Sequence, residues 1–239
     1  MLDALFMKLD LRDPLHPEER AELQENISPP RRYLTGQEMV VQGSSPREST
    51  LLVEGLTARA NTLYDGAQQI TALHIPGDFV DLHSFLLRTM DHSVVALTDC
   101  RVVTIAHPRL RTLTARFPHL ARLLWLSTLL DAAIHRQWIV GLGRRDAVSH
   151  AAHLLCEMSL RLSVVGLCRD HTYELDLHQG ELANVLGLSR ATVNAALQTM
   201  RARGVISWQG ATVRILDWDA LAEIAEFDPT YLQLQPMPV

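Results

Sequence analysis

Residues 178–206 contain two short helical patterns on either side of a turn, in the sequence HQGELANVLGLSRATVNAALQTMRARGVI. The turn is Gly187-Leu188-Ser189. Glycine adopts the left-handed conformation that reverses a chain after a helix, and serine is a preferred residue at a helix N-terminus. The stretch therefore predicts one helix over about 179–186 and a second that begins after Ser189, together forming a helix-turn-helix.

The spacing of apolar residues predicts which faces of these two helices are buried. Ala183 is small, so it allows the helices to cross closely. The outward face at the start of the second helix is then short and polar. The predicted buried residues are Leu182, Val185, Leu186, Val193, Ala196, Leu197 and Met200, and the outward residues are Arg190, Ala191, Thr192, Asn194 and Ala195.

The outward residues have the chemistry of a major-groove contact. Arginine pairs with guanine and asparagine with adenine, so Arg190 and Asn194 are predicted base contacts. Ser189 and Thr192 suit phosphate oxygens at a helix N-terminus, and the later arginines suit backbone phosphate. The predicted DNA-binding residues are Gln179, Ser189, Arg190, Thr192, Asn194, Arg201 and Arg203.

The charge distribution supports this interpretation. The chain of 239 residues has a net charge of −5, which argues against general binding to polyanions, but residues 188–204 contain no acid. Two short strands with a turn at Gln209-Gly210 follow and predict a wing. The alternative is a plain helical hairpin with solvated arginines. The acidic tail beyond Asp217 could contact RNA polymerase, cover the wing, or do neither.

The N-terminal half has a different pattern. Residues 1–30 predict short helices that end at Pro29-Pro30, and residues 31–104 predict short strands separated by turns. Four turn glycines at intervals of 12, 11 and 11 residues favour an antiparallel roll over a βαβ alternation; they are Gly43, Gly55, Gly66 and Gly77.

The stretch after Pro108 predicts a long helix that is apolar around most of its circumference. A helix facing one domain needs an apolar stripe on one side only, so we expect a second copy of the chain to cover this helix in a parallel dimer. A central helix inside one domain is the alternative. Gly141 and Gly143 are predicted to end the helix at a hinge, and Asp146 to cap the next one.

The predicted fold class is α+β, with a jelly-roll sensor, a dimerisation helix and a C-terminal winged helix-turn-helix. The predicted domains are 1–117, 118–143 and 144–239. No apolar run is long enough to span a membrane, and the N-terminus has no secretory pattern, so we expect a cytoplasmic protein that contacts no membrane. We expect buried free thiols at the three widely spaced cysteines, neither disulfides nor a zinc site, and no enzymatic activity.

The whole chain resembles the Crp/Fnr superfamily of bacterial transcription regulators. The resemblance rests on PGDF at 76–79, the long helix after FPHL, GLGRRDA at 141–147, and the helix-turn-helix stretch. It implies a cytoplasmic homodimer with a cyclic-nucleotide-binding-type roll, a dimer helix, and a winged helix that binds a palindromic operator in double-stranded DNA. RNA polymerase is the further partner that the resemblance implies.

The chain departs from the cyclic-AMP-binding members at several positions. It has Val80 to His83 where those members place a ribose-binding Gly-Glu-Leu, and His92-Ser93 where they place the phosphate-binding Arg-Ser. Cyclic AMP is therefore not expected, and the effector is unknown or absent. The resemblance places a tentative effector pocket at Phe79, Val80, Asp81, Leu82, His83, His92, Ser93, His135 and Arg136.

Two further departures concern the cofactor and the operator. The oxygen-sensing branch holds an iron–sulfur cluster on N-terminal cysteines, but no cysteine precedes Cys100, so this cluster is not expected. The cyclic-AMP branch has Arg-Glu-x-x-x-Arg on the reading helix, where this chain has Arg190, Ala191 and Ala195. A different operator is therefore expected.

Three histidines in the roll, His74, His83 and His92, are spaced at nine residues and raise a metal or haem hypothesis. The spacing matches no known ligand pattern, so we favour histidines that line a pocket or the surface, predict no metal or other cofactor, and leave haem open. The alternative function is a metal- or ligand-binding roll whose C-terminal helices serve assembly. That alternative predicts no salt-dependent affinity for DNA.

Overall fold

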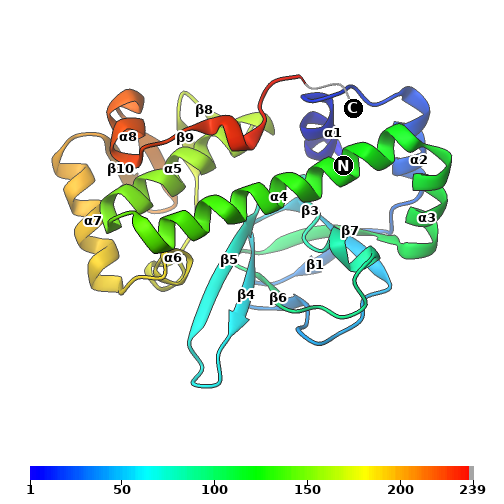
Figure 1. Cartoon of the computed structure of the whole chain (residues 1–239), viewed down its shortest axis with the longest axis horizontal. Helices are drawn as coiled ribbons and strands as arrows, with labels where there is room; N and C mark the ends of the chain where they lie inside the picture. The colour runs from blue at the N-terminus through cyan, green and yellow to red at the C-terminus, as the bar shows by residue number, and fades with distance from the viewer. Residues whose placement is uncertain (237–239) are drawn as a thin grey trace. The chain divides into compact units, whose positions relative to one another are not determined.

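The computed structural model describes residues 1–236, and these residues fall into two compact units (Figure 1). The roll unit comprises residues 1–61, 72–132 and 233–236, and the DNA-binding-type unit comprises residues 62–71 and 133–232. Among the residues described, no helix combines the length and apolar character needed to cross a membrane.

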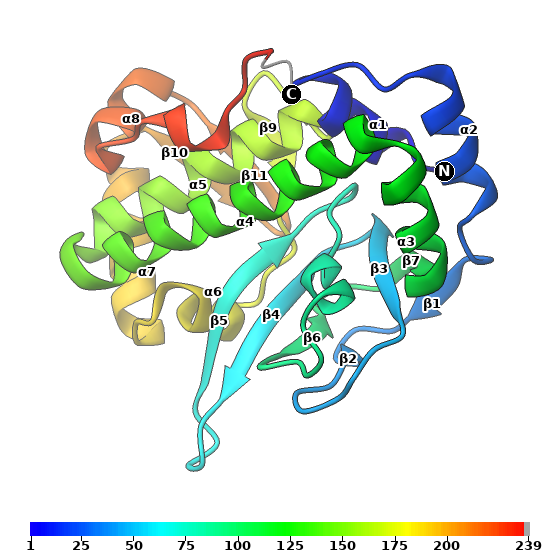
Figure 2. The same cartoon turned by 45° about the vertical axis from the view of Figure 1, so that its right-hand side comes forward.

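The roll is built from two antiparallel sheets, with strand orders β1-β7-β3 and β2-β6-β4-β5. β4 and β5 form the long hairpin in Figure 2. The bounds are β1 (Arg31–Tyr33), β2 (Glu38–Val40), β3 (Glu48–Glu54), β4 (Thr57–Thr62), β5 (Gln68–His74), the 3-10 helix η1 (Leu82–Phe85), β6 (Ser93–Ala96) and β7 (Cys100–Ala106).

In the sheet β1-β7-β3, most residues of β3 and β7 are buried and pack on both faces, whereas the edge strand β1 is largely exposed. Leu52 and Val102 pack in one hydrophobic cluster with residues of β2 and β6, whereas Leu51 and Val103 pack in another cluster with the helices. Successive side chains of a strand point to opposite faces, so each face has its own cluster. This explains why buried residues are consecutive in β3 and β7, at 49–52 and 102–105, rather than alternating with exposed ones.

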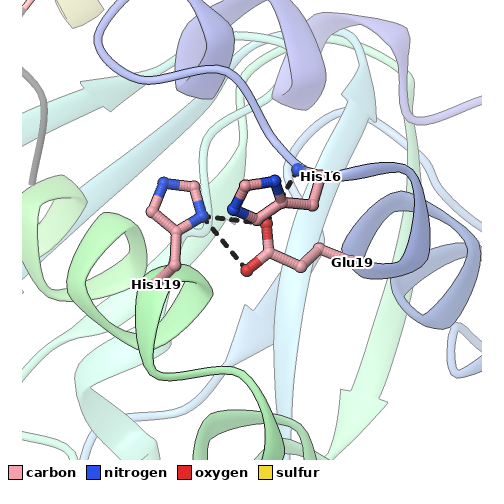
Figure 3. A group of neighbouring side chains, drawn as sticks. All are labelled: His16, Glu19 and His119. Atoms are coloured by element: carbon pink, nitrogen blue, oxygen red, sulfur yellow. Dashed lines mark hydrogen bonds and ion pairs between the residues drawn. The ribbon is translucent and has the colours of Figure 1, made fainter.

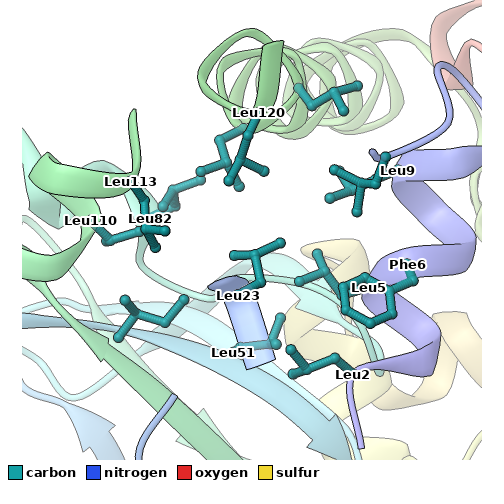
Figure 4. Packing of buried hydrophobic residues seen from close by; sticks show 14 of the residues in the cluster. Leu2, Leu5, Phe6, Leu9, Leu23, Leu51, Leu82, Leu110, Leu113 and Leu120 are labelled. Atoms are coloured by element: carbon teal, nitrogen blue, oxygen red, sulfur yellow. The ribbon is translucent and has the colours of Figure 1, made fainter. Parts of the chain in front are cut away.

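The helical side of this sheet holds the larger cluster, which Figure 4 shows. Leu5 and Phe6 of the first helix, Leu23 of the second and Leu120 of the fourth meet Leu51 there. The helices are α1 (Asp3–Asp10), α2 (Pro17–Glu25), α3 (His107–Arg116) and α4 (Pro118–Arg144).

The predicted turn glycines are confirmed as left-handed positions. Gly43, Gly55, Gly66 and Gly77 all have φ between 81° and 94°. Gly77 is also a place of close approach, because an added Cβ would lie 2.7 Å from the backbone of Ala4 in α1. An alanine there would therefore meet both backbone strain and a clash with α1.

The long helix differs from the sequence prediction at its end. α4 continues to Arg144, so Gly141 and Gly143 lie inside the helix and do not end it. A Cβ at Gly141 would lie 2.5 Å from Nε2 of His150, so this glycine allows the next helix to approach closely. Asp146 caps that helix as predicted, because its Oδ1 accepts hydrogen bonds from the amides of Val148 and Ser149 at 2.9 and 2.8 Å.

The DNA-binding-type unit combines helices with the antiparallel sheet β10-β11-β9-β8. The predicted wing is β10 and β11, which pair from Ile206↔Ile215 to Gln209↔Thr212. The bounds are α5 (Ala147–Val164), β8 (Cys168–Arg169), β9 (Thr172–Glu174), α6 (Gln179–Leu186), α7 (Arg190–Ala202), β10 (Ile206–Gln209), β11 (Thr212–Ile215), α8 (Trp218–Ala225) and the 3-10 helix η2 (Pro229–Leu232).

A buried carboxylate organises the core of this unit. Glu157 on α5 is fully buried and accepts hydrogen bonds from Trp138, Arg161 and Tyr231, with contacts between 2.8 and 3.3 Å. Because a buried charge is tolerated when its partners are complete, these contacts stabilise the packing of α4 and η2 on α5. The acidic segment after Asp217 is thus folded onto its own unit up to Leu232.

Candidate nucleic-acid interface and sensor site

The helix-turn-helix forms where the sequence predicts it. α6 ends at Gly187, which has φ 62° and ψ 30° in the left-handed region. Ser189 then caps α7, with its hydroxyl oxygen accepting a hydrogen bond from the amide of Thr192 at 3.1 Å. These two residues reverse the chain and fix the start of the second helix.

The faces of α6 and α7 are also confirmed. All seven apolar residues predicted to be inward are buried, and so is Ala183 at the crossing. Arg190, Thr192 and Ala195 are exposed, and Asn194 is partly exposed. The first turn of α7 is therefore polar and cationic on its outer side, and the inner side of the helix is fully packed.

Three of the predicted DNA-binding residues lie at the starts of α6 and α7. Nδ2 of Asn194 lies 3.4 Å from Oε1 of the exposed Gln179, so the starts of α6 and α7 meet at these two side chains. The Arg190 guanidinium lies close to Gly180, where an added Cβ would come within 2.7 Å of Nη2. Arg190 also lines a shallow surface hollow at the start of α6 together with His178 and Leu188.

The later arginines differ in their contacts. Arg201 donates a hydrogen bond to the carbonyl oxygen of Trp208 in β10 at 3.3 Å, which ties α7 to the wing. Arg203 follows α7 as its C-terminal cap and is exposed. The contact between Arg201 and the wing could not be found from the sequence pattern.

The residues of the predicted effector pocket divide into packed and polar side chains. Val80 belongs to the hydrophobic cluster between the sheets and Leu82 to the cluster under the helices, where Phe79 also packs. The Ser93 hydroxyl accepts a hydrogen bond from the amide of Gln42 at 3.1 Å. His135, which is partly buried, and Arg136, which is exposed, lie on α4 in the part of the chain that groups with the other unit.

Asp81 is a buried carboxylate that holds β3. Its oxygens accept hydrogen bonds from the amide and the hydroxyl of Thr50, at 2.5 and 3.3 Å. Burial raises the pKa of Asp81 to about 7, and the bonds to Thr50 oppose this rise. Asp81 therefore has a structural task in the roll.

Arg59 is a buried cation that sequence reasoning missed. It lies on β4 and is 7% exposed, with Nη1 3.0 Å from Oδ2 of Asp131 on α4. Its Nη2 lies 3.4 Å from both Nε2 of His74 and the carbonyl oxygen of Val80. The available signal was an arginine between alanines in a predicted strand, because such a residue is rarely buried without a partner.

His83 and His92 lie together in the roll, with ring centroids 5.1 Å apart. His83 is on η1, and His92 directly precedes β6. Nδ1 of His92 lies 2.6 Å from Oδ1 of Asp91, whereas the Nε2 atoms of both histidines are buried without a hydrogen-bond partner within residues 1–236. Burial, reinforced by Arg59, lowers the pKa of His83 to about 4 and also lowers the pKa of His92.

A second histidine cluster lies between α2 and α4 (Figure 3). The buried Glu19 accepts hydrogen bonds from the amides of His16 and Leu120 at 2.9 and 3.1 Å. Nδ1 of His119 lies 2.9 and 3.1 Å from the two oxygens of Glu19, and its Nε2 lies 3.3 Å from Asp13. Each of these polar groups has a partner, so the cluster is explained as a structural connection.

The three cysteines are free, and Cys100 and Cys156 are buried as expected, but Cys168 is only partly buried, which corrects the expectation for that residue. Cys100 belongs to the roll unit, where burial raises its pKa, and Cys156 and Cys168 belong to the other unit. Burial raises the pKa of Cys156 to about 12. An iron–sulfur cluster is held by several cysteine thiolates at one place.

Comparison with known families places both halves of the chain. Residues 30–117 match the model of the cyclic nucleotide-binding domain, and residues 150–224 match the model of the Crp-like helix-turn-helix domain. The two matched segments cover the roll and the helix-turn-helix with its wing.

Whole-chain relatives agree. The transcriptional activator protein FnrL of Cereibacter sphaeroides is 31% identical over 210 residues, which are 85% of this chain and 83% of that protein. The transcriptional activator protein anr of Pseudomonas aeruginosa is 28% identical over 189 residues, covering 79% and 77% of the two chains. The solved structure of FixK2 from Bradyrhizobium japonicum superposes with a TM-score of 0.75 at 23% identity, covering 82% of this chain and 96% of FixK2. The chain therefore belongs to the Crp/Fnr family of DNA-binding transcription regulators.

Proposed function

We propose that this regulator binds a palindromic operator as a homodimer, with one α7 in the major groove of each half-site. The observation that carries this proposal is the first turn of α7. Arg190 and Thr192 are exposed in this turn, and Asn194 is partly exposed. The opposite face of α7 is fully buried, and Arg201 connects α7 to the wing by a hydrogen bond. The seven predicted DNA-binding residues remain assigned to this interface.

The dimer proposal rests on α4. Trp125, Leu129, Ile139 and Val140 are large apolar residues that stay exposed on this helix, with Trp125 at 66% and Ile139 at 67%. Their spacing follows one stripe of a helix, which is the pattern of a helix that packs on a partner helix. In this proposal the chain has three parts, which are a sensor domain of 1–117, a dimer helix of 118–143 and a DNA-binding domain of 144–239.

The roll is proposed to control the spacing of the two α7 helices. A signal bound in the roll would favour one arrangement of the dimer, and only a spacing near one DNA turn, about 34 Å, engages both half-sites. We propose that the signal is neither cyclic AMP nor an iron–sulfur cluster. Two observations support this: His92-Ser93 stands where the cyclic-AMP-binding members have Arg-Ser, and no cysteine precedes Cys100. RNA polymerase and the cytoplasm are the proposed partner and location.

The proposed function is tested by selecting bound sequences from a random double-stranded DNA pool at moderate salt. We expect an enriched palindrome whose half-sites are separated by one helical turn. A folded, dimeric protein that enriches no sequence, with or without added cell extract, would contradict DNA recognition. That result would favour a roll protein whose C-terminal helices serve assembly.

A further inference from the structure

His83 and His92 of the roll each have a buried ring nitrogen that is available to bind a ligand. His92 is 4% exposed, and His83 is partly buried. Their Nε2 atoms find no hydrogen-bond partner within the described residues. Leaving a buried polar atom unsatisfied costs about 1–3 kcal/mol, so two such atoms on neighbouring rings need an explanation.

The hydrogen bond of His92 fixes which nitrogen is available. Nδ1 lies 2.6 Å from the Asp91 carboxylate, which is an acceptor, so Nδ1 carries the proton and Nε2 has the free lone pair. A carboxylate that holds the far nitrogen of a metal-binding histidine orients the ring and makes it more basic. Asp91 is itself held in place, because its carbonyl oxygen accepts a hydrogen bond from Asn61 at 2.9 Å.

The charges around the pair suit a cation. The two imidazoles lie near one guanidinium, Arg59, and two carboxylates, Asp91 and Asp131. Arg59 and Asp131 form an ion pair at 3.0 Å, which leaves the Asp91 charge to balance a ligand.

We propose that His83 and His92 bind one divalent transition-metal ion through their Nε2 atoms, with Asp91 orienting His92. One ligand atom each from His83, Asp91 and His92 lie within 4.8 Å of one another. Imidazole nitrogens lie about 2.0–2.1 Å from a bound zinc ion, and the two rings, with centroids 5.1 Å apart, are close enough to share one ion. Imidazole ligands suit zinc, copper, iron and nickel, rather than calcium or magnesium.

The site has a structural consequence. His83 lies on η1 and His92 directly precedes β6, so an ion would connect the two ends of the segment 84–91. Leu86 is 82% exposed within this segment. Two protein ligands leave further coordination positions for water or for another molecule.

The test uses the full chain, freed of metal with a chelator and titrated with cobalt(II), whose ligand-field absorption reports imidazole coordination. We expect one equivalent to bind, zinc to displace it, and the ion to raise the unfolding temperature. His83→Gln and His92→Gln should each abolish this binding step. Asp91→Asn changes an exposed side chain and should weaken binding about 10–100-fold without disturbing the fold.

His16→Asn is the matched control, because it alters the other histidine cluster and asparagine is a good helix cap. It should bind cobalt as the unaltered chain does. The proposal is overturned if a folded chain binds no stoichiometric ion, if His83→Gln and His92→Gln together leave binding intact, or if His16→Asn removes it. A porphyrin absorption band in the purified protein would also overturn it in favour of haem. The measurements contain no DNA, so they stand apart from the operator selection.

Discussion

The roll unit contains two histidine–carboxylate clusters of similar composition and opposite character. In one cluster, the buried Glu19 and His119 have complete sets of partners. In the other, His83 and His92 each keep a buried nitrogen without a partner in the part of the chain that the structure describes, and the carboxylate of Asp91 is 84% exposed. The same residue types therefore form a fully hydrogen-bonded cluster in one place and a cluster with unpartnered nitrogens in the other.

The difference shows how to separate structural from functional polar groups. A buried group whose hydrogen bonds are complete stabilises the packing around it, as Glu157 also does in the second unit. A group with spare capacity leaves room for a ligand. The same distinction applies to α7 at the surface. Arg190 and Thr192 are hydrated there at little free-energy cost, and DNA phosphates can replace this water.

The largest expected effect comes from breaking the closed cluster. Glu19→Ala removes the acceptor for the amides of His16 and Leu120 and for His119, so these groups are left without their partner in a buried site. We expect the free energy of unfolding to fall by about 3–5 kcal/mol. Urea unfolding followed by circular dichroism measures this change.

Glu19→Gln is the control for this prediction, because the amide keeps one oxygen acceptor of the same shape. It should lose clearly less stability than Glu19→Ala. Equal losses from both substitutions would show that the negative charge, rather than the acceptor geometry, holds α2 to α4.

The second unit offers a pH test, because it buries histidines without carboxylate partners. Burial, helped by Arg145, lowers the pKa of His150 to about 4 and of His153 to about 3. The unfolded chain then binds more protons than the folded one between about pH 4 and 6.5. Stability from these residues is present above about pH 6.5 and is lost as the pH falls toward 4, by up to about 1.4 kcal/mol per pH unit for each histidine.

His153→Leu should remove its share of this dependence. The ring packs against Phe227 and Tyr231, with centroids 5.1 and 5.9 Å away, so an apolar replacement keeps part of the packing. Unfolding free energies at pH 5 and pH 7.5 should differ less in the variant than in the unaltered chain. An unchanged difference would mean that His153 is protonated in the folded state.

Arg190→Ala should affect binding and leave folding unchanged. We expect a loss of about 1–3 kcal/mol on the selected operator and relaxed specificity at one base pair in each half-site. Arg203→Ala is the control, and it should weaken all sequences similarly and lower the salt dependence by about one counterion. Equal loss for Arg190→Ala on operator and random DNA would mark Arg190 as a phosphate contact. Competition binding assays at several salt concentrations separate these results.

Local sequence rules were sufficient for the helix-turn-helix and insufficient for the polar interior of the roll. Gly187, Ser189 and the apolar spacing of α7 act within a few residues of one another, so they could be predicted. Arg59 and its partner Asp131 are 72 residues apart in the sequence, and no local pattern connects them. Gly141 misled the helix-end prediction because the reason for the glycine is the ring of His150, which packs against it in three dimensions.

The smallest expected effect completes the comparison of the two clusters. Asp91→Ala removes a carboxylate 2.6 Å from His92, yet this carboxylate is exposed, so water replaces much of what is lost. In metal-free protein, the free energy of unfolding should change by no more than about 0.5 kcal/mol, against several for Glu19→Ala. Urea unfolding of both variants under the same conditions measures the contrast. A loss from Asp91→Ala comparable to that from Glu19→Ala would make this cluster structural too, because its carboxylate would then stabilise the fold without any ligand.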